Sequence, residues 1–193
     1  MAKVLGLLGL QGDYALHAKA LHRLGIPHRL VRWPDDLKEC SGLIFPGGES
    51  TTFLNLMDRT GLRDAIVNFA KDKPVMGTCA GLIVLAARVQ NQDMKTLGLI
   101  DLEVKRNAFG RQIHSFQAPV RLLPFPDHPS FEGVFIRAPQ IVSIGKETEA
   151  LGFYKEQVVM ARSRNVLVMT FHPELTPDTR IHRFFYHSFV QTG

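Results

Sequence analysis

One of the two cysteines of this chain stands in the setting of a catalytic nucleophile. Cys79 lies between Gly77 and Gly81 in the pattern G-x-C-x-G, with an apolar run before it and a helix-like run after it. In a sharp strand-to-helix turn of this kind, the central residue is strained and its side chain points out of the turn. The start of the helix favours the reactive thiolate, and the next N–H, that of Ala80, is placed to stabilise an oxyanion. The pattern predicts covalent catalysis by Cys79; the alternative is a buried structural cysteine.

The proton-transfer group expected beside Cys79 is His172. A nucleophilic cysteine needs a histidine that moves protons and a third group that orients this histidine. His172 follows an apolar strand-like run and precedes Pro173 and Glu174. Residues i and i+2 of extended backbone point to the same side, so Glu174 is able to reach the His172 ring and fix its tautomer. The other histidines lack such a partner and are expected to be exposed or partly buried, namely His17, His22, His28, His114, His128, His182 and His187.

A glycine turn offers a second set of backbone N–H groups. Gly47 and Gly48 follow an apolar run and precede Glu49 and a helix-like segment. The lysine and the spacing of a Walker phosphate loop are absent, so an oxyanion N–H from Gly48 is the better interpretation, with a plain tight turn as the alternative. Because glycine tolerates both peptide orientations, we also expect that this turn is able to flip. The isolated protein would then be nearly inactive until a partner sets the oxyanion hole.

Two arginines are candidates for holding a substrate carboxylate. Arg106 lies in R-N-A-F-G-R-Q and Arg137 in F-I-R-A-P. A guanidinium binds a carboxylate at two points, although either arginine alone could equally form a surface salt bridge. The sequence does not decide which of the two acts. No cysteine and histidine pair has zinc-ligand spacing, so no metal site is expected, and Cys40, which lacks the glycine frame, is interpreted as structural.

The elements that must position these residues follow an α/β pattern. Short apolar runs alternate with segments of helical periodicity in the first half of the chain, which favours a parallel sheet covered by helices on both faces. Ligands bind at the carboxyl ends of such strands, where residues 46–52, 77–81 and 171–174 would meet. The expected strands are 4–10, 28–31, 43–45 and 75–77, and the expected helices are 14–24, 51–57, 62–71 and 82–89.

The second half of the chain is richer in strands. We expect it to add antiparallel strands to the central sheet and to close with a helix. The predicted fold is therefore a three-layer α/β sandwich with a mostly parallel centre and antiparallel additions. The expected strands are 99–104, 115–122, 134–136, 141–144, 157–161 and 166–170, and the closing helix is 180–190.

The composition limits the class of protein. The chain has 193 residues, 45% hydrophobic and 21% charged, which predicts one globular domain over residues 1–193. No apolar run approaches the roughly 20 residues that cross a bilayer, and the apolar N-terminus is interpreted as a buried strand rather than a signal peptide. A cytosolic (cytoplasmic) location is therefore expected. Two cysteines are too few for a disulfide scaffold, and in a reducing compartment each should be a free thiol. The net charge of +5 is scattered, which favours a solvated surface or an acidic protein partner over nucleic acid.

Together these segments resemble the class I, triad-type glutamine amidotransferases. Within that class the sequence is similar to the glutaminase subunits of pyridoxal 5′-phosphate synthases. The cysteine turn and H-P-E alone would indicate only the superfamily, whereas P-G-G-E-S-T-T, R-N-A-F-G-R-Q and F-I-R-A-P together are specific to the subfamily. The matching stretches span nearly the whole chain in the family's order and are residues 9–12, 46–52, 77–81, 106–112, 135–139 and 170–175.

The resemblance implies an activity and a partner. The family hydrolyses L-glutamine and passes ammonia to a (β/α)₈-barrel synthase that makes pyridoxal 5′-phosphate, so this phosphate is a product of the complex and no cofactor is expected here. Cys79 would be acylated, with His172 and Glu174 as its relay. The remaining implied roles are glutamine contacts for Gly47, Gly48, Glu49, Arg106, Ile136 and Arg137, oxyanion donors Gly48 and Ala80, and Gln11 near the active site and the synthase interface.

Three other functions are alternatives to this one. The first is a glutaminase for another acceptor, such as the histidine or guanine pathway, which R-N-A-F-G-R-Q and F-I-R-A-P disfavour. The second is a non-catalytic regulatory protein of the same fold, which the intact Cys79, His172 and Glu174 disfavour. The third is a cysteine peptidase, for which the sequence gives no signal of a peptide groove.

Overall fold

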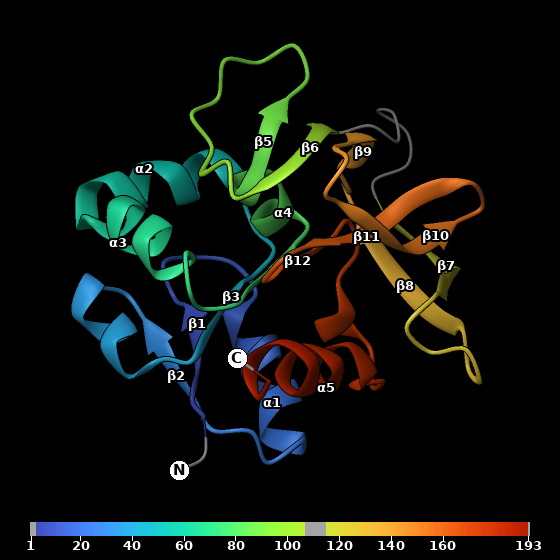
Figure 1. The fold of residues 1–193 in the computed structure, drawn as a ribbon, viewed down its shortest axis with the longest axis horizontal. Coiled ribbons are helices and arrows are strands. Elements are labelled where there is room, and N and C mark those ends of the chain that lie inside the picture. The colour runs from blue at the N-terminus through green and yellow to red at the C-terminus, as the bar shows by residue number, and fades with distance from the viewer. Residues whose placement is uncertain (1–2, 107–114, 193) are drawn as a thin grey trace.

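The computed structural model describes residues 3–106 and 115–192. Its largest element is a nine-stranded mixed sheet in which strands far apart in the chain lie side by side (Figure 1). The order across this sheet is β2 (His28–Val31), β1 (Leu5–Leu8), β3 (Gly42–Phe45), β4 (Val75–Thr78), β12 (Val166–Met169), β11 (Gln157–Ser163), β10 (Glu149–Tyr154), β7 (Ser115–Leu122) and β8 (Ser130–Ile136).

The strands from β2 to β12 are parallel and form the core of the sheet. Four of them, β1, β3, β4 and β12, are buried along their whole length. Such strands are apolar without alternation because both of their faces are covered. Side chains of β12 enter two different cores in turn, since Val166 and Val168 pack on one face and Leu167 and Met169 on the other.

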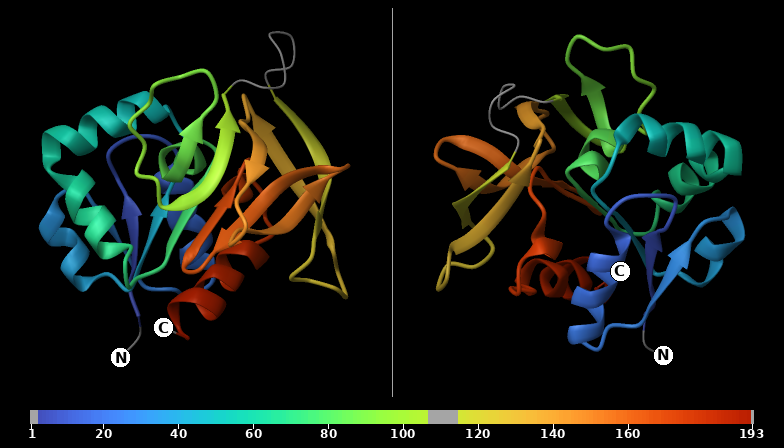
Figure 2. Two further views of the ribbon diagram at one scale, coloured as in Figure 1. Left: turned by 45° about the horizontal axis from the view of Figure 1, so that its top comes forward. Right: turned by 180° about the vertical axis from the view of Figure 1, so that it is seen from behind.

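Helices cover both faces of this parallel core. On one face lie α2 (Ser50–Thr60), α3 (Leu62–Phe69) and α4 (Ala80–Leu85). On the other lie α1 (Tyr14–Arg23) and α5 (Arg180–Phe185), which continues into the π-helical turn η3 (Tyr186–Val190). Figure 2 shows the two helical layers on opposite sides of the sheet, so the predicted three-layer α/β fold is confirmed. Within the part of the chain that the structure describes, no helix is long and apolar enough to cross a membrane.

One predicted helix is wrong in its second half. The sequence predicted a helix over 82–89, but α4 ends after six residues and the strand β5 (Ala86–Val89) follows. The backbone N–H groups of Leu97 and Leu99 donate to the last two carbonyls of α4, each at 2.8 Å. These carbonyls would otherwise serve the next helical turn, so the returning chain ends the helix.

The placement of two predicted strands is also wrong. β6 (Ile100–Lys105) and β9 (Gln140–Ile144) do not extend the central sheet but join β5 in a separate three-stranded sheet. Their apolar side chains pack into the same core as α4, so this small sheet covers the helix that follows Cys79. The predicted strands β7, β8 and β11 are antiparallel additions to the central sheet, as expected. The sequence analysis missed β10, which is a further antiparallel addition. The predicted strand β12 is parallel to β4 and antiparallel to β11. The short helix η1 (Pro34–Glu39) was also missed.

Candidate active site

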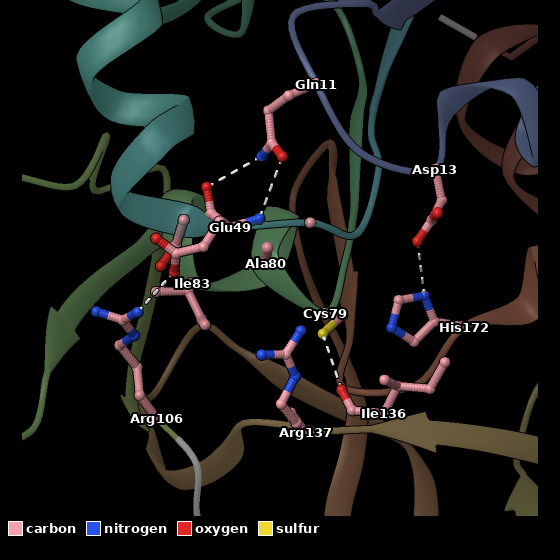
Figure 3. A pocket seen from close by; sticks show the side chains of 12 residues that line it. Gln11, Asp13, Glu49, Cys79, Ala80, Ile83, Arg106, Ile136, Arg137 and His172 are labelled. Atoms are coloured by element: carbon pink, nitrogen blue, oxygen red, sulfur yellow. Dashed lines mark hydrogen bonds and ion pairs between the residues drawn. The ribbon is translucent and has the colours of Figure 1, made fainter. Parts of the chain in front are cut away.

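Three segments at the carboxyl ends of neighbouring strands form the candidate active site. β3, β4 and β12 are adjacent in the sheet, and the glycine turn 46–48, Cys79 and His172 follow them closely in the chain. Because the carboxyl ends of parallel strands meet at one edge, the three segments lie together despite their separation in sequence. Figure 3 shows Cys79 and His172 facing one another across a cavity.

The turn around Cys79 has the geometry of a nucleophile elbow. Cys79 has φ 49° and ψ −103°, a strained conformation for a residue other than glycine. A Cβ on Gly81 would lie 2.4 Å from the carbonyl oxygen of Phe45, and one on Gly77 would lie 2.8 Å from the carbonyl carbon of Gly81. The two glycines are therefore required by close backbone packing. The thiol Sγ lies 3.7 Å from the carbonyl oxygen of Ile136, at the rim of the cavity.

His172 and Glu174 form a buried ion pair beside Cys79. Nδ1 of His172 lies 2.7 Å from Oε1 of Glu174, and the residues are 3% and 4% exposed. Burial alone would lower the pKa of His172, but Cys79 and Glu174 outweigh it and raise this pKa to about 10. Burial likewise opposes ionisation of Glu174, yet His17 and His172 lower its pKa to about 2. At neutral pH the pair is therefore an imidazolium and a carboxylate, and Figure 3 shows the second ring nitrogen of His172 on the side of Cys79.

Two further histidines lie behind this pair, which corrects the sequence analysis. His17 on α1 and His182 on α5 were expected to be exposed or partly buried, but both are 0% exposed. His17 Nδ1 lies 2.9 Å from His182 Nε2, and His17 Nε2 lies 3.4 Å from Oε2 of Glu174. Burial lowers the pKa of His17, and it lowers the pKa of His182 to about 3, so both rings are neutral near pH 7. The contacts join α1 to α5, 165 positions apart, which sequence spacing could not reveal.

The cavity beside Cys79 gathers most of the residues predicted for the substrate site. Three residues that the sequence analysis missed, Asp13, Ser50 and Ile83, also line it. Asp13 directly follows the segment 9–12, Ser50 lies within the segment 46–52, and Ile83 lies one helical turn beyond Ala80, so the sequence held a signal for each of them. The volume of the cavity is about 340 Å³. The other lining residues are Gln11, Gly48, Glu49, Cys79, Ala80, Arg106, Ile136, Arg137 and His172.

Gln11 holds the glycine turn in place. Its amide nitrogen donates to the carbonyl of Glu49 at 3.0 Å, and the N–H of Glu49 donates back to the Gln11 side-chain oxygen at 3.4 Å. Gly48 has φ +152°, and a Cβ there would lie 2.7 Å from the Gln11 amide. Gln11 thus packs against the backbone proposed to bind an oxyanion, which is a more specific place than the sequence analysis gave it.

The peptide between Gly47 and Gly48 is fixed by the first loop of the chain. The N–H of Asp13 donates to the carbonyl of Gly47 at 3.1 Å. In a trans peptide the N–H of Gly48 points the opposite way from this carbonyl. Gly47 itself lies against His172, because a Cβ on Gly47 would come 2.3 Å from Cε1 of the ring. Gly47 therefore supports the site from beside His172 and is not among the lining residues of the cavity.

The two candidate arginines differ in their surroundings. Arg106 donates to the Glu49 carboxylate at 2.8 Å and to the side-chain oxygen of Gln92 at 3.2 Å. Arg137 is exposed and meets no hydrogen-bond or ion-pair partner within residues 3–106 and 115–192. Its backbone is held at φ 42°, in the left-handed region that non-glycine residues rarely adopt. The rest of the R-N-A-F-G-R-Q motif, 107–112, lies outside the described residues, as does His114.

Possible metal ligands gather at one place in the described part of the chain. Donor atoms of Asp13, His172 and Glu174 lie within 4.8 Å of one another. The 2.7 Å separation of His172 and Glu174 is that of a hydrogen bond, so a proton already joins two of the three groups. The arrangement therefore fits proton transfer, with Asp13 Oδ2 at 4.0 Å from His172 Nδ1 as an additional negative charge.

Comparison with known proteins identifies the family. The model of the SNO glutamine amidotransferase family matches residues 7–191. The chain belongs to this family. The resemblance drawn from the motifs is thereby confirmed, and so is the family's fold.

Curated relatives align over almost the whole chain. One relative, pyridoxal 5′-phosphate synthase subunit PdxT of Thermosipho africanus, is 44% identical over 182 residues, which cover 94% of this chain and 96% of the relative. The protein of the same name from Oenococcus oeni is 46% identical over 187 residues, with 96% of each chain covered. A solved structure described as a glutamine amidotransferase is 40% identical, covers 94% of this chain and 96% of its own, and superposes with a TM-score of 0.89.

Proposed function

We propose that this chain hydrolyses the side-chain amide of L-glutamine to L-glutamate and ammonia, with residues 1–193 as one glutaminase domain. The observation that carries the proposal is a single cavity that contains a strained cysteine, an ionised histidine and a set of opposite charges. In Figure 3, Glu49, Arg106 and Arg137 lie on the other side of Cys79 from His172. The charges match an α-amino acid, and the Cys79 and His172 pair matches acyl transfer.

Substrate orientation follows from the charges of the cavity. The α-ammonium group of glutamine pairs with the carboxylate of Glu49, and the α-carboxylate pairs with the guanidinium of Arg137, which has no charge partner within residues 3–106 and 115–192. Arg106 holds Glu49 in position through their 2.8 Å ion pair. Ile136, whose carbonyl lies beside the thiol, borders the aliphatic part of the substrate. The δ-amide then reaches Cys79.

The reaction proceeds through a thioester. The Cys79 thiolate attacks the δ-carbon, and the N–H groups of Ala80 and Gly48 stabilise the oxyanion. His172 gives its Nε2 proton to the departing ammonia and becomes neutral. It then takes a proton from water, which attacks the thioester, and glutamate leaves as the thiolate is restored. Glu174 stabilises the imidazolium at both ends of the cycle, and the chemistry needs no cofactor.

The ammonia has a destination in this proposal. The curated relatives are named as subunits of pyridoxal 5′-phosphate synthase. By this likeness the chain delivers ammonia to a (β/α)₈-barrel synthase subunit in the cytosol, and pyridoxal 5′-phosphate is the product of the pair. Docking of that subunit near Gln11 and Asp13 would act on the Gly47 peptide. The N–H of Asp13 donates to the carbonyl of Gly47, and the side chain of Gln11 donates to the carbonyl of Glu49. A flip of the peptide would have to break the 3.1 Å bond from Asp13.

Ammonia release from glutamine tests the proposal directly. Wild type, Cys79→Ala and the matched control Cys40→Ala are assayed with and without the barrel subunit of a pyridoxal 5′-phosphate synthase. We expect release that depends on Cys79, is retained in Cys40→Ala and rises when the barrel subunit is added. Release that needs Cys79 but ignores the barrel would move the enzyme to another ammonia acceptor. No release in any mixture would contradict the glutaminase activity.

A further inference from the structure

A chain of polar side chains continues from the proposed triad into the interior. His17 on α1 lies between three partners: His182 Nε2 at 2.9 Å from its Nδ1, and Thr78 Oγ1 at 3.3 Å and Glu174 Oε2 at 3.4 Å from its Nε2. His17, Thr78 and His182 are at most 1% exposed, and Glu174 is 4% exposed. Buried polar groups are costly unless they are paired, so this cluster has a defined arrangement of hydrogen bonds.

The direction of these hydrogen bonds follows from the charge of Glu174. If Nδ1 of neutral His17 carried the proton, its Nε2 lone pair would face the carboxylate, which is repulsive in a buried site. The proton therefore sits on Nε2 and points toward Glu174 Oε2 and Thr78 Oγ1. Thr78 is free to accept because its own hydroxyl faces the Phe45 carbonyl at 3.5 Å.

The tautomer of His182 follows from that of His17. Nδ1 of His17 is then an acceptor, so the proton between the two rings belongs to His182 Nε2. His182 Nδ1 is left as a bare acceptor, and this atom has no hydrogen-bond partner in the described part of the chain. Leaving a lone pair unpaired on a neutral ring is the consistent outcome, because burial keeps both histidines neutral.

We propose that His17 is a positioning residue of the glutaminase: its Nε2–H holds the outer oxygen of Glu174, and His182 fixes the tautomer that makes this possible. The inference rests on the proposed function, since Glu174 acts there through His172. Glu174 Oε1 is bonded to His172 at 2.7 Å, whereas Oε2 has no hydrogen-bond partner in the described residues and lies 3.4 Å from His17 Nε2 as its ion-pair counterpart. Contacts to catalytic groups are often long in a ligand-free site and tighten as charge develops, which fits the 3.4 Å separation.

Restraint of both carboxylate oxygens has a consequence for His172. A carboxylate held at one oxygen is able to rotate about its terminal torsion, and the His172 ring would follow it away from Cys79. A carboxylate held at both oxygens keeps Nε2 of His172 aimed at the nucleophile. Groups that orient the ligands of metal sites typically change activity by roughly 10–100-fold when they are removed, and by analogy we expect a loss of this size for His17.

The first test reads the tautomers and needs no activity. In ¹⁵N-histidine spectra of the full chain, His17 and His182 are expected as neutral rings protonated on Nε2 between pH 6 and 8, assigned by the loss of signals in His17→Gln and His182→Gln. A protonated Nδ1 or a charged ring at His17 would overturn the proposal. Because this measurement is independent of catalysis, it stands even if the glutaminase assay fails.

The second test compares two amides at position 17 in the assay with the barrel subunit. The amide nitrogen of glutamine lies near the place of the imidazole Nε2, whereas that of asparagine lies near the place of Nδ1. We expect His17→Asn to lower kcat roughly 10–100-fold with little change in KM, and His17→Gln to retain most of kcat. The exposed His187→Gln is the control and should match wild type.

Melting temperatures separate positioning from structure. If His17→Gln and His17→Asn lose activity equally, or in proportion to their loss of thermal stability, His17 is only a structural residue and the proposal fails. A wild-type enzyme without Cys79-dependent ammonia release would instead contradict the proposed function, and the tautomer measurement would still decide the arrangement of His17.

Discussion

Arg106 donates to the Glu49 carboxylate at 2.8 Å, so one of the two arginines of the cavity already has a charge partner before a substrate arrives. Arg137 has no such partner in the part of the chain that the structure describes. The structure thereby distinguishes two residues that the sequence left equivalent, and it favours Arg137 as the group that binds the α-carboxylate.

Substitution of Arg137 should act mainly on substrate binding. We expect Arg137→Ala to raise KM for glutamine roughly 10–100-fold, since a hydrogen bond to a charged group contributes about 1.5–3 kcal/mol. Arg137→Lys keeps the charge but loses the fork and should lie between wild type and Arg137→Ala. Arg106→Ala should change KM less. A larger increase of KM in Arg106→Ala than in Arg137→Ala would reverse the assignment.

Removal of the negative charge of Glu174 should impair catalysis. In Glu174→Gln the imidazolium of His172 loses its counter-charge, and by analogy with other triads kcat should fall roughly 10²–10⁴-fold. Steady-state kinetics with the barrel subunit present measure the effect. Asp13→Asn, which alters a carboxylate 4.0 Å from the same ring nitrogen, is the matched control and should cost less. Equal losses in the two variants would argue against a special role for Glu174.

Glu174 should also contribute to the stability of the protein against acid. Its pKa is lowered from 4.5 to about 2 in the folded protein, so its ionised form stabilises the fold fully above pH 4.5 and this stabilisation is lost as the pH falls toward 2. The difference in melting temperature between wild type and Glu174→Gln should therefore shrink over that range. Calorimetry in a series of buffers measures it, and a difference that is constant with pH would contradict the linkage.

The two cysteines should differ in reactivity. Burial raises the pKa of Cys40 to about 11, and its thiol faces the carbonyl of Asp36 at 3.3 Å, so its thiolate is scarce at neutral pH. Cys79 lies at the wall of an open cavity beside an imidazolium, which favours alkylation. Mass spectrometry after brief treatment with iodoacetamide should find the label on Cys79 in the native protein and on both after denaturation. Native labelling of Cys40 at a similar rate would contradict this.

A side chain at Gly81 should disturb the nucleophile. In Gly81→Ala the new Cβ would lie 2.4 Å from the Phe45 carbonyl, and overpacking of this kind typically costs about 1–3 kcal/mol. Because the displaced backbone carries Cys79 two residues earlier, kcat should fall along with the melting temperature. Gly25→Ala, where a Cβ would meet nothing within 4 Å, also costs stability through its φ of +66° but should leave kcat unchanged.

The catalytic segments were predictable because their information is local. Gly77 and Gly81 flank Cys79 within a few residues, and His172 and Glu174 lie on one side of a short stretch of chain. The alternation of strands and helices in the first half was predictable for the same reason, since each parallel strand is apolar throughout its length.

The parts that the sequence could not reveal depend on distant contacts. His17 and His182 resemble ordinary helix residues in the sequence, because they contact each other across 165 positions and His17 also contacts the distant Thr78 and Glu174. The end of α4 was mispredicted because Leu97 and Leu99, beyond the helix, bind its last carbonyls. Two of the three strands of the small sheet, β6 and β9, have the pattern of central-sheet strands, and only their packing with α4 separates them.

The position of β12 in the sheet bears on how the enzyme is made. β12 lies between β4 and β11, yet it is the last strand to leave the ribosome, and His172 and Glu174 follow it immediately. A growing chain can present Cys79 long before these residues exist. The proposed acid–base pair therefore emerges together with the strand that fills the gap between β4 and β11. We expect an unfinished chain to hold a thiol without its activating histidine and so to leave glutamine intact during synthesis.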